Sequence, residues 1–204
     1  MVLGIVVIVA LGATAAAVIA MRAKTGPAAP TPSPASTVSP TVQPSSTTAS
    51  AAPAPPTQRQ AAQNLSGLLS LSVADRGSIV AAAQNVGACG TGLAQDAKTF
   101  QNAATSRRSL LSRLASLSGR STLPVSMLSD LARAWQASAQ ADQDLAAWAK
   151  DESRGCSANS SSDANFRAAA GPDRRATRFK KAFVRQWNPV ASQYSLPSYP
   201  WNRL

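Results

Sequence analysis

The chain contains few side chains that could carry out chemistry, and its two cysteines are the first of them. Cys89 and Cys156 lie far apart in a sequence of 204 residues that has no histidine. Two thiols without histidine make a poor zinc site, and redox-active cysteines are usually close in sequence. The sequence therefore favours a structural disulfide over two free thiols. Closing a loop of about 68 residues would stabilise the fold by about 4 kcal/mol in the chain-entropy model.

Catalysis by the remaining side chains has little support in the sequence. The absence of histidine removes Ser-His-Asp and Cys-His catalysis and the most frequent metal ligand. Two carboxylate pairs, Asp142/Asp144 and Asp151/Glu152, are too close along one helix for their side chains to point the same way. We therefore expect solvated helix charges there. The sequence predicts no catalytic residue, no metal and no cofactor.

Three other charged residues occupy positions that the helical pattern assigns to the interior. These are Arg76, Arg107 and Asp142. A buried pair of arginine and carboxylate would fix the register of neighbouring helices, although its net stability is near zero or negative. We predict that Asp142 pairs with Arg76 or Arg107. The alternatives are a small polar pocket inside the bundle, or a rotation of these positions toward solvent.

Positive charge is concentrated near the carboxyl end. The formal net charge is +11, and six basic residues lie between Arg174 and Arg185. On a helix, four cations fall opposite an apolar sector of Ala176, Phe179, Phe183 and Trp187: Arg174, Arg178, Lys181 and Arg185. Such a face would attract teichoic-type polymers, anionic lipid head groups or extracellular DNA, unless it is only a solvated surface. No aromatic residue is interleaved with the cations, so neither base stacking nor sequence-specific nucleic-acid binding is predicted.

The elements that position these residues are helices. Apolar residues at alternating spacings of about three and four predict helices over 57–88, 91–117 and 125–154. A polar loop over 155–171 is expected to precede a fourth helix that begins at Pro172 and is broken at Asn188-Pro189.

These elements predict an all-α fold. Four helices with short connections suggest an up-down-up-down four-helix bundle over 58–204, with the tail from Leu196 to Leu204 extended against it. In that topology Cys89 and Cys156 meet at the same pole, which is where a disulfide could form.

The amino-terminal part has a different composition. Residues 1–24 begin with an uncharged apolar run long enough to span a bilayer, which predicts a transmembrane signal-anchor or a cleaved signal peptide. Residues 25–57 contain nine prolines and no charge, which is typical of a disordered linker. Arg22 and Lys24 follow the apolar run and by themselves would keep the head in the cytoplasm. The linker and the cysteines favour a head outside the membrane.

This layout of anchor, stalk and head resembles the membrane-anchored secreted proteins of high-G+C Gram-positive, actinobacterial type. The resemblance covers all 204 residues and rests on layout and composition, without a specific motif. It implies an extracytoplasmic head on a stalk that crosses the cell wall, and it transfers no functional residue.

The leading functional hypothesis is a non-enzymatic, envelope-tethered helical module that binds or senses something outside the membrane, through its basic helix face if the partner is an anionic polymer. A second hypothesis is a structural or assembly protein that docks another membrane protein. A carboxylate-dependent glycan hydrolase is a remote third, because it would need two acids a few ångströms apart.

Overall fold

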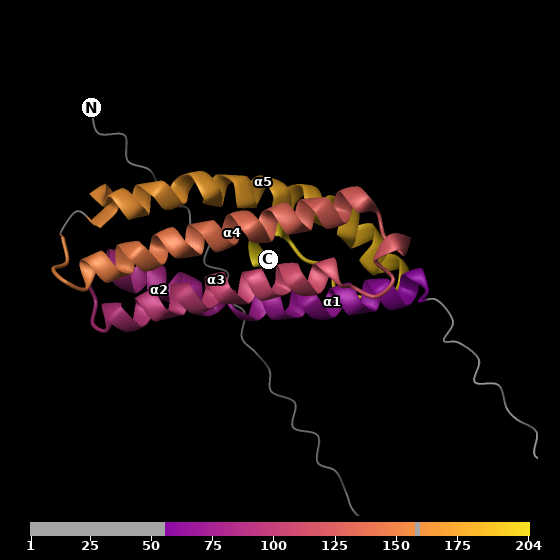
Figure 1. Cartoon of the computed structure of the whole chain (residues 1–204), viewed down its shortest axis with the longest axis horizontal. Helices are drawn as coiled ribbons and strands as arrows, with labels where there is room; N and C mark the ends of the chain where they lie inside the picture. The colour runs from indigo at the N-terminus through magenta and orange to yellow at the C-terminus, as the bar shows by residue number, and fades with distance from the viewer. Residues whose placement is uncertain (1–55, 158–159) are drawn as a thin grey trace, which may run out of the picture. The chain divides into compact units, whose positions relative to one another are not determined.

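The part of the chain that the structure describes is all-helical, as predicted. The structure is a computed structural model, and it describes residues 56–157 and 160–204 (Figure 1). Its α-helices are α1 (Gln58–Ala74), α2 (Arg76–Gly87), α3 (Leu93–Ala115), α4 (Val125–Glu152) and α5 (Ala164–Gln193). Short 3-10 turns are η1 (Arg120–Thr122), η2 (Ser160–Ser162) and η3 (Trp201–Arg203).

The predicted anchor over 1–24 and nearly all of the predicted linker over 25–57 lie outside the described residues. Among the helices that are described, none is long and apolar enough to cross a membrane.

The helices form a bundle in which α1 and α2 share one direction and each later helix reverses the direction of the one before it (Figure 1). α1 and α2 run along one side, α3 returns beside them, α4 runs back along α3, and α5 returns along α4 (Figure 1). The most extensive contacts are those of α4 with α5 and with α3. Short turns join the ends of α3 and α4, which makes them antiparallel neighbours.

The first predicted helix, 57–88, is interrupted once. α1 begins with a capping box in which Thr57 and Gln60 each bind the backbone N–H of the other. It ends at Ala74, and α2 begins at Arg76. Asp75 and Gly77 are poor helix formers and account for the break. Because Asp75 keeps helical backbone angles (φ −72°, ψ −20°), the chain continues along the same side of the bundle.

The predicted loop over 155–171 is too long, because α5 begins before its end, and the predicted break at Pro189 is wrong. α5 starts at Ala164, where Asp163 Oδ1 accepts the backbone N–H groups of Asn165 (2.7 Å) and Phe166 (3.1 Å). It then continues through Pro172 and Pro189. A proline inside a helix costs roughly 3 kcal/mol. The buried stripe on α5 runs past both prolines, and burial of its large aromatic side chains contributes a comparable or larger amount.

A carboxyl-terminal strap, residues 195–204, packs against α5 and reaches α1, where Tyr199 Oη lies 3.5 Å from Ser70 Oγ. Asn188 holds Tyr199 by two hydrogen bonds, donating Nδ2–H to its carbonyl and accepting its N–H, both at 3.1 Å. Trp187 Nε1 donates to the Pro197 carbonyl at 3.1 Å, and Leu204 is buried. At the end of α5, Tyr194 Oη donates to Gln58 Oε1 of α1 at 2.6 Å.

The interior consists of two apolar clusters with a polar layer between them. The first cluster is built around Leu65, Leu69, Trp135, Phe183 and Trp187. The second is built around Val86, Phe100 and Trp148, with Phe166 against it. Between the two clusters, four helices each carry a buried residue that is polar or charged: Ser72 on α1, Arg107 on α3, Asp142 on α4 and Lys180 on α5. We call these four residues the polar layer.

The strap makes a testable contribution to stability. Replacing Asn188 with Ala removes both hydrogen bonds to Tyr199 and should lower the free energy of unfolding by about 1–2 kcal/mol. Hydrogen exchange of residues 197–203 should accelerate more than exchange in α3. Asn102→Ala, at an exposed site on α3 whose side chain forms no hydrogen bond with another described residue, is the matched control. Equal stability of the two variants would show that the strap is not held by Asn188.

Candidate functional site

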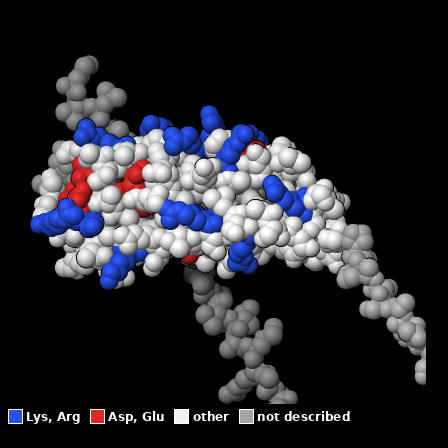
Figure 2. All heavy atoms as spheres, in the orientation of Figure 1, with Lys and Arg blue, Asp and Glu red and all other residues white. Residues whose placement is uncertain are grey.

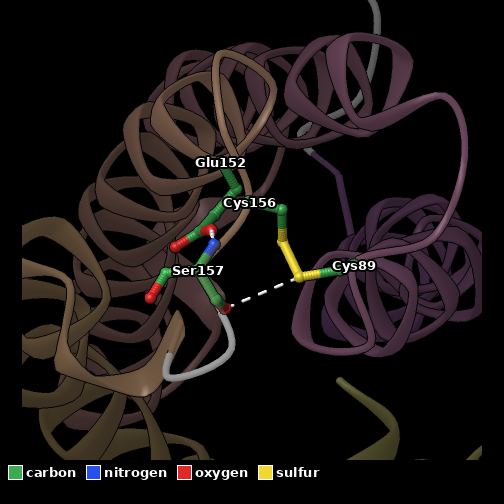
Figure 3. Close-up of a disulfide and its surroundings, with 4 residues drawn as sticks. All are labelled: Cys89, Glu152, Cys156 and Ser157. Carbon is green, nitrogen blue, oxygen red and sulfur yellow. Dashed lines mark hydrogen bonds between the residues drawn. A yellow bond between two sulfur atoms is a disulfide. The ribbon is translucent and has the colours of Figure 1, made fainter.

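The predicted disulfide between Cys89 and Cys156 is confirmed (Figure 3). It ties the turn after α2 to the turn after α4, with the two Cα atoms 5.7 Å apart. Cys89 has a positive φ of 52°, which ends the helix and turns its side chain toward Cys156. The bridge therefore fixes which turns meet at this pole of the bundle.

Glu152 supports the turn that carries Cys156. Its Oε2 accepts the backbone N–H of Ser157 at 2.8 Å (Figure 3). The side chain of Glu152 is buried, whereas a solvated charge was expected at this position. Cys89, Glu152 and Cys156 bring three potential metal-ligand atoms within 4.8 Å of one another. Both sulfurs are already bonded to each other, so the arrangement serves the disulfide.

Two of the three charged residues predicted for the interior are brought together. Arg107 Nε donates to Asp142 Oδ2 at 2.9 Å, and both side chains are almost completely buried. Arg107 Nη1 also donates to Ser72 Oγ at 3.3 Å, and the same oxygen accepts Trp135 Nε1–H at 3.0 Å. Asp142 is thus not a solvated helix charge, and Asp144 lies away from it, accepting a hydrogen bond from Gln140.

Arg76 takes a different position from the one predicted. It is half-buried at the start of α2 and forms no ion pair with a carboxylate of the described residues. The pKa of the Arg76 guanidinium is lowered, mainly by burial and to a smaller extent by repulsion from Arg107. Burial also raises the pKa of Asp142, and attraction to Arg107 offsets only part of that effect. Burial of the pair between Arg107 and Asp142 therefore adds little net stability, and its role is to specify the register of α3 against α4.

Lys180 is a second buried charged residue, after Glu152, that was not predicted from the sequence. It is 8% exposed, and no hydrogen bond joins its Nζ to another described residue. Burial lowers its pKa to about 7, with added repulsion from Arg107 and Arg76, while Asp173 and Asp142 oppose the shift. A signal was present, because position 180 continues the stripe of Ala176, Phe183 and Trp187 at helical spacing.

The four predicted surface cations on α5 are all exposed. Arg174, Arg178, Lys181 and Arg185 project from the side of α5 opposite the interior, and basic side chains line the edge of the molecule where α5 lies (Figure 2). None of the four pairs with a carboxylate of the described residues. We call these four residues the basic face.

Aromatic rings, rather than acids, contact the basic face. The Cζ atom of Arg178 lies 4.8 Å from the ring centre of Phe179, and the Cζ atom of Arg133 on α4 lies 5.6 Å from the same ring centre. Phe179 is accordingly half-buried beneath the two guanidinium groups, not in the core sector where it was expected. Lys181 Nζ lies 4.6 Å from the ring centre of Trp201 in the strap. The expectation that no aromatic residue adjoins the cations is therefore wrong.

The surface also carries two open hollows of different character. One, of about 450 Å³, lies at the turn between α3 and α4 and is lined by Leu117, Gly119, Arg120, Ser121, Val125 and Leu128. The other, of about 370 Å³, lies between α2 and α3 and is lined by Asp75, Ser78, Thr99, Asn102, Ala103 and Ser106. Each contains at most one carboxylate.

In comparisons with known proteins, no protein-family model, curated protein sequence or solved structure matches this chain.

The buried ion pair generates a first prediction for this region. Asp142→Ala leaves Arg107 buried and uncompensated, and should lower the free energy of unfolding by about 3–5 kcal/mol. A double-mutant cycle with Arg107→Met should show coupling well above the roughly 1 kcal/mol or less expected of an exposed pair. Arg154 and Asp151, an exposed pair at 3.2 Å, provide that comparison. Equal coupling energies in the two pairs would show that burial does not strengthen the interaction between Arg107 and Asp142.

Lys180 generates a second prediction, on pH dependence. Its pKa is lowered to about 7 in the folded state from 10.5, so the unfolded chain binds more protons between these values. Stability should therefore rise as pH increases from about 7 toward 10. Lys180→Met should stabilise the protein at pH 7 by roughly 1–3 kcal/mol and flatten this rise. Urea unfolding of wild type and of Lys180→Met between pH 6.5 and 9.5 tests both expectations. Lys150→Met, at an exposed position, is the control. An unchanged pH profile in Lys180→Met would contradict the assignment.

Proposed function

We propose that this helical bundle is a non-enzymatic binding module that contacts an anionic polymer through the basic face of α5. The observation that carries the proposal is the exposure of Arg174, Arg178, Lys181 and Arg185 on one side of one helix, without a carboxylate partner among the described residues. Unpaired cations at this density attract a polyanion because binding releases its condensed counterions.

The ring contacts support the same proposal. A cation paired with a carboxylate loses much of its field, as Arg154 does beside Asp151. A cation held over a ring keeps its full charge and gives up part of its conformational freedom before a ligand arrives. Arg178 over Phe179 and Lys181 over Trp201 are held in this way. The basic face is therefore both charged and partly ordered.

We also propose that the module works outside the membrane. Residues 1–24 would act as a single-pass anchor, or as a signal peptide whose cleavage releases the protein, and residues 25–57 would form the linker. The disulfide supports an oxidising compartment, because such bonds are rare in the cytosol. The anionic partner would then be a polymer of the cell envelope or its surroundings.

One observation favours a second candidate function, the docking of another envelope protein. The hollow between α3 and α4 is partly apolar, and Val125 at its rim is 78% exposed. A partner that buries this side chain would make the module a structural or assembly protein. A glycan hydrolase has less support, since neither described hollow is lined by two carboxylates.

The test replaces all four residues of the basic face with Gln. Binding of inorganic polyphosphate at about 50 mM salt should be lost, while wild-type affinity should fall with a slope of about 3 in a plot of log K against log salt, as expected for four contacts. Helicity and melting temperature should change little, because Gln and Arg have similar helix propensity.

A charge-matched control separates local from global electrostatics. Four exposed cations on α3 and η1 are replaced with Gln in the same way: Lys98, Arg108, Arg113 and Arg120. This variant has the same net charge as the first and should bind within about twofold of wild type if the contact is local. Equal losses in both variants would mean that net charge alone drives binding. Absence of binding by wild type would move the docking function to first place.

A further inference from the structure

The basic face has an aromatic component that is supplied by a distant part of the chain. The strap brings Trp201 of η3 against α5, where its ring lies under Lys181. Trp135, Trp148 and Trp187 are each at most 2% exposed, whereas Trp201 is 38% exposed. It is the one tryptophan of the chain that a ligand in solution could reach.

Exposure of this indole has no evident structural reason. Nearby members of the strap are used for packing: Leu204 is buried, and Tyr199 is fixed by Asn188. Trp201 keeps more than a third of its surface in water, although burying it would contribute a few kcal/mol. An exposed aromatic side chain beside unpaired cations is the combination that binds single-stranded nucleic acid, with phosphates on the cations and bases stacked on the rings.

From this arrangement we infer that the polymer bound by the basic face is single-stranded nucleic acid, recognised without sequence preference by a base stacked on Trp201 while its phosphates contact Arg178, Lys181 and Arg185. This inference rests on the proposed function, and it names the chemical class of the ligand. The guanidinium of Arg178, held over Phe179, offers a second planar surface for stacking.

Other polyanions fit these observations less well. A polyphosphate or a teichoic-type chain has no flat ring and would use the cations alone. A lipid surface would gain from several apolar side chains, but the large exposed apolar residues of the described chain are Leu71, Val125 and Trp201, and only Trp201 contacts the basic face. Double-stranded DNA has its bases already stacked and would also be bound by charge alone.

The dimensions of the face set the length of the ligand. Arg185 lies eleven positions after Arg174, which corresponds to about 16 Å along a helix. A stacked single strand advances about 3.4 Å per nucleotide, so this face accommodates about five nucleotides. That length is within the range of sequence-tolerant single-strand sites, which begin at about four nucleotides.

The experiment compares four ligands on the full chain at one salt concentration: a dT12 oligonucleotide, a 12-base-pair duplex, polyphosphate and heparin. Fluorescence anisotropy or competition gives each affinity. Trp201→Ala should weaken binding of dT12 by about tenfold, because stacking of one base contributes that much or more. Affinity for polyphosphate and the duplex should stay within about twofold of wild type. Trp201→Phe, which keeps a ring, should restore most of the affinity for dT12.

Each alternative outcome is distinct. If wild type binds polyphosphate and the basic-face variant does not, but Trp201→Ala binds dT12 as wild type does, the proposed function stands and the nucleic-acid inference is overturned. If Trp201→Ala weakens heparin as much as dT12, the ring binds sugars and the inferred ligand class is wrong. If wild type binds none of the four, the proposed function itself fails. Melting temperatures of both Trp201 variants control for displacement of the strap.

Discussion

The ion pair between Arg107 and Asp142 is the constraint on which the arrangement of the bundle depends. It joins α3 to α4 in the layer between the two apolar clusters, and its members are almost completely buried. Apolar side chains alone would tolerate a shift of one helix by a turn, because Leu and Ala pack at many positions. A shift here would separate a buried cation from its carboxylate, which is strongly unfavourable. The pair, together with the disulfide at one pole, therefore selects one register.

Lys180 adds a second energetically unfavourable buried charge to the polar layer. It adds a cation beside Arg107 without a hydrogen-bond partner among the described residues, and its lowered pKa reflects that environment. Because Lys180 shares α5 with the basic face, one helix presents cations both to the interior and to solvent. The interior cation has lost part of its affinity for a proton, whereas the exterior ones remain hydrated. Burial therefore changes the proton affinity of a lysine on α5.

The strap connects stability with the proposed function. Asn188 and Trp187 fix its backbone, which places Trp201 beside Lys181 of the basic face. Arg133 of α4 reaches the same face through Phe179 of α5. A surface that looked purely electrostatic from the order of residues thus combines charges and rings from two helices and the strap. Such a combination suits a ligand that has both phosphates and flat rings.

Much of the fold was determined by the sequence alone. The spacing of apolar residues predicted the all-α class and the approximate extents of α3 and α4, because helical periodicity is a local property. The cysteine positions, combined with antiparallel helices, predicted the bond between Cys89 and Cys156. Inward positions also singled out Arg107 and Asp142, since a charge within an apolar stripe stands out from its neighbours.

Tertiary packing decided the rest. Pro172 and Pro189 remain inside α5 because an unbroken buried stripe outweighs the local cost of each proline, which local rules cannot weigh. The choice of Arg107 over Arg76 as partner of Asp142 depends on how α2 and α3 sit against α4. The meeting of Trp201 with Lys181 depends on how the strap folds back along α5. Sequence spacing specifies which face of a helix a residue occupies, but only three-dimensional packing specifies what that face meets.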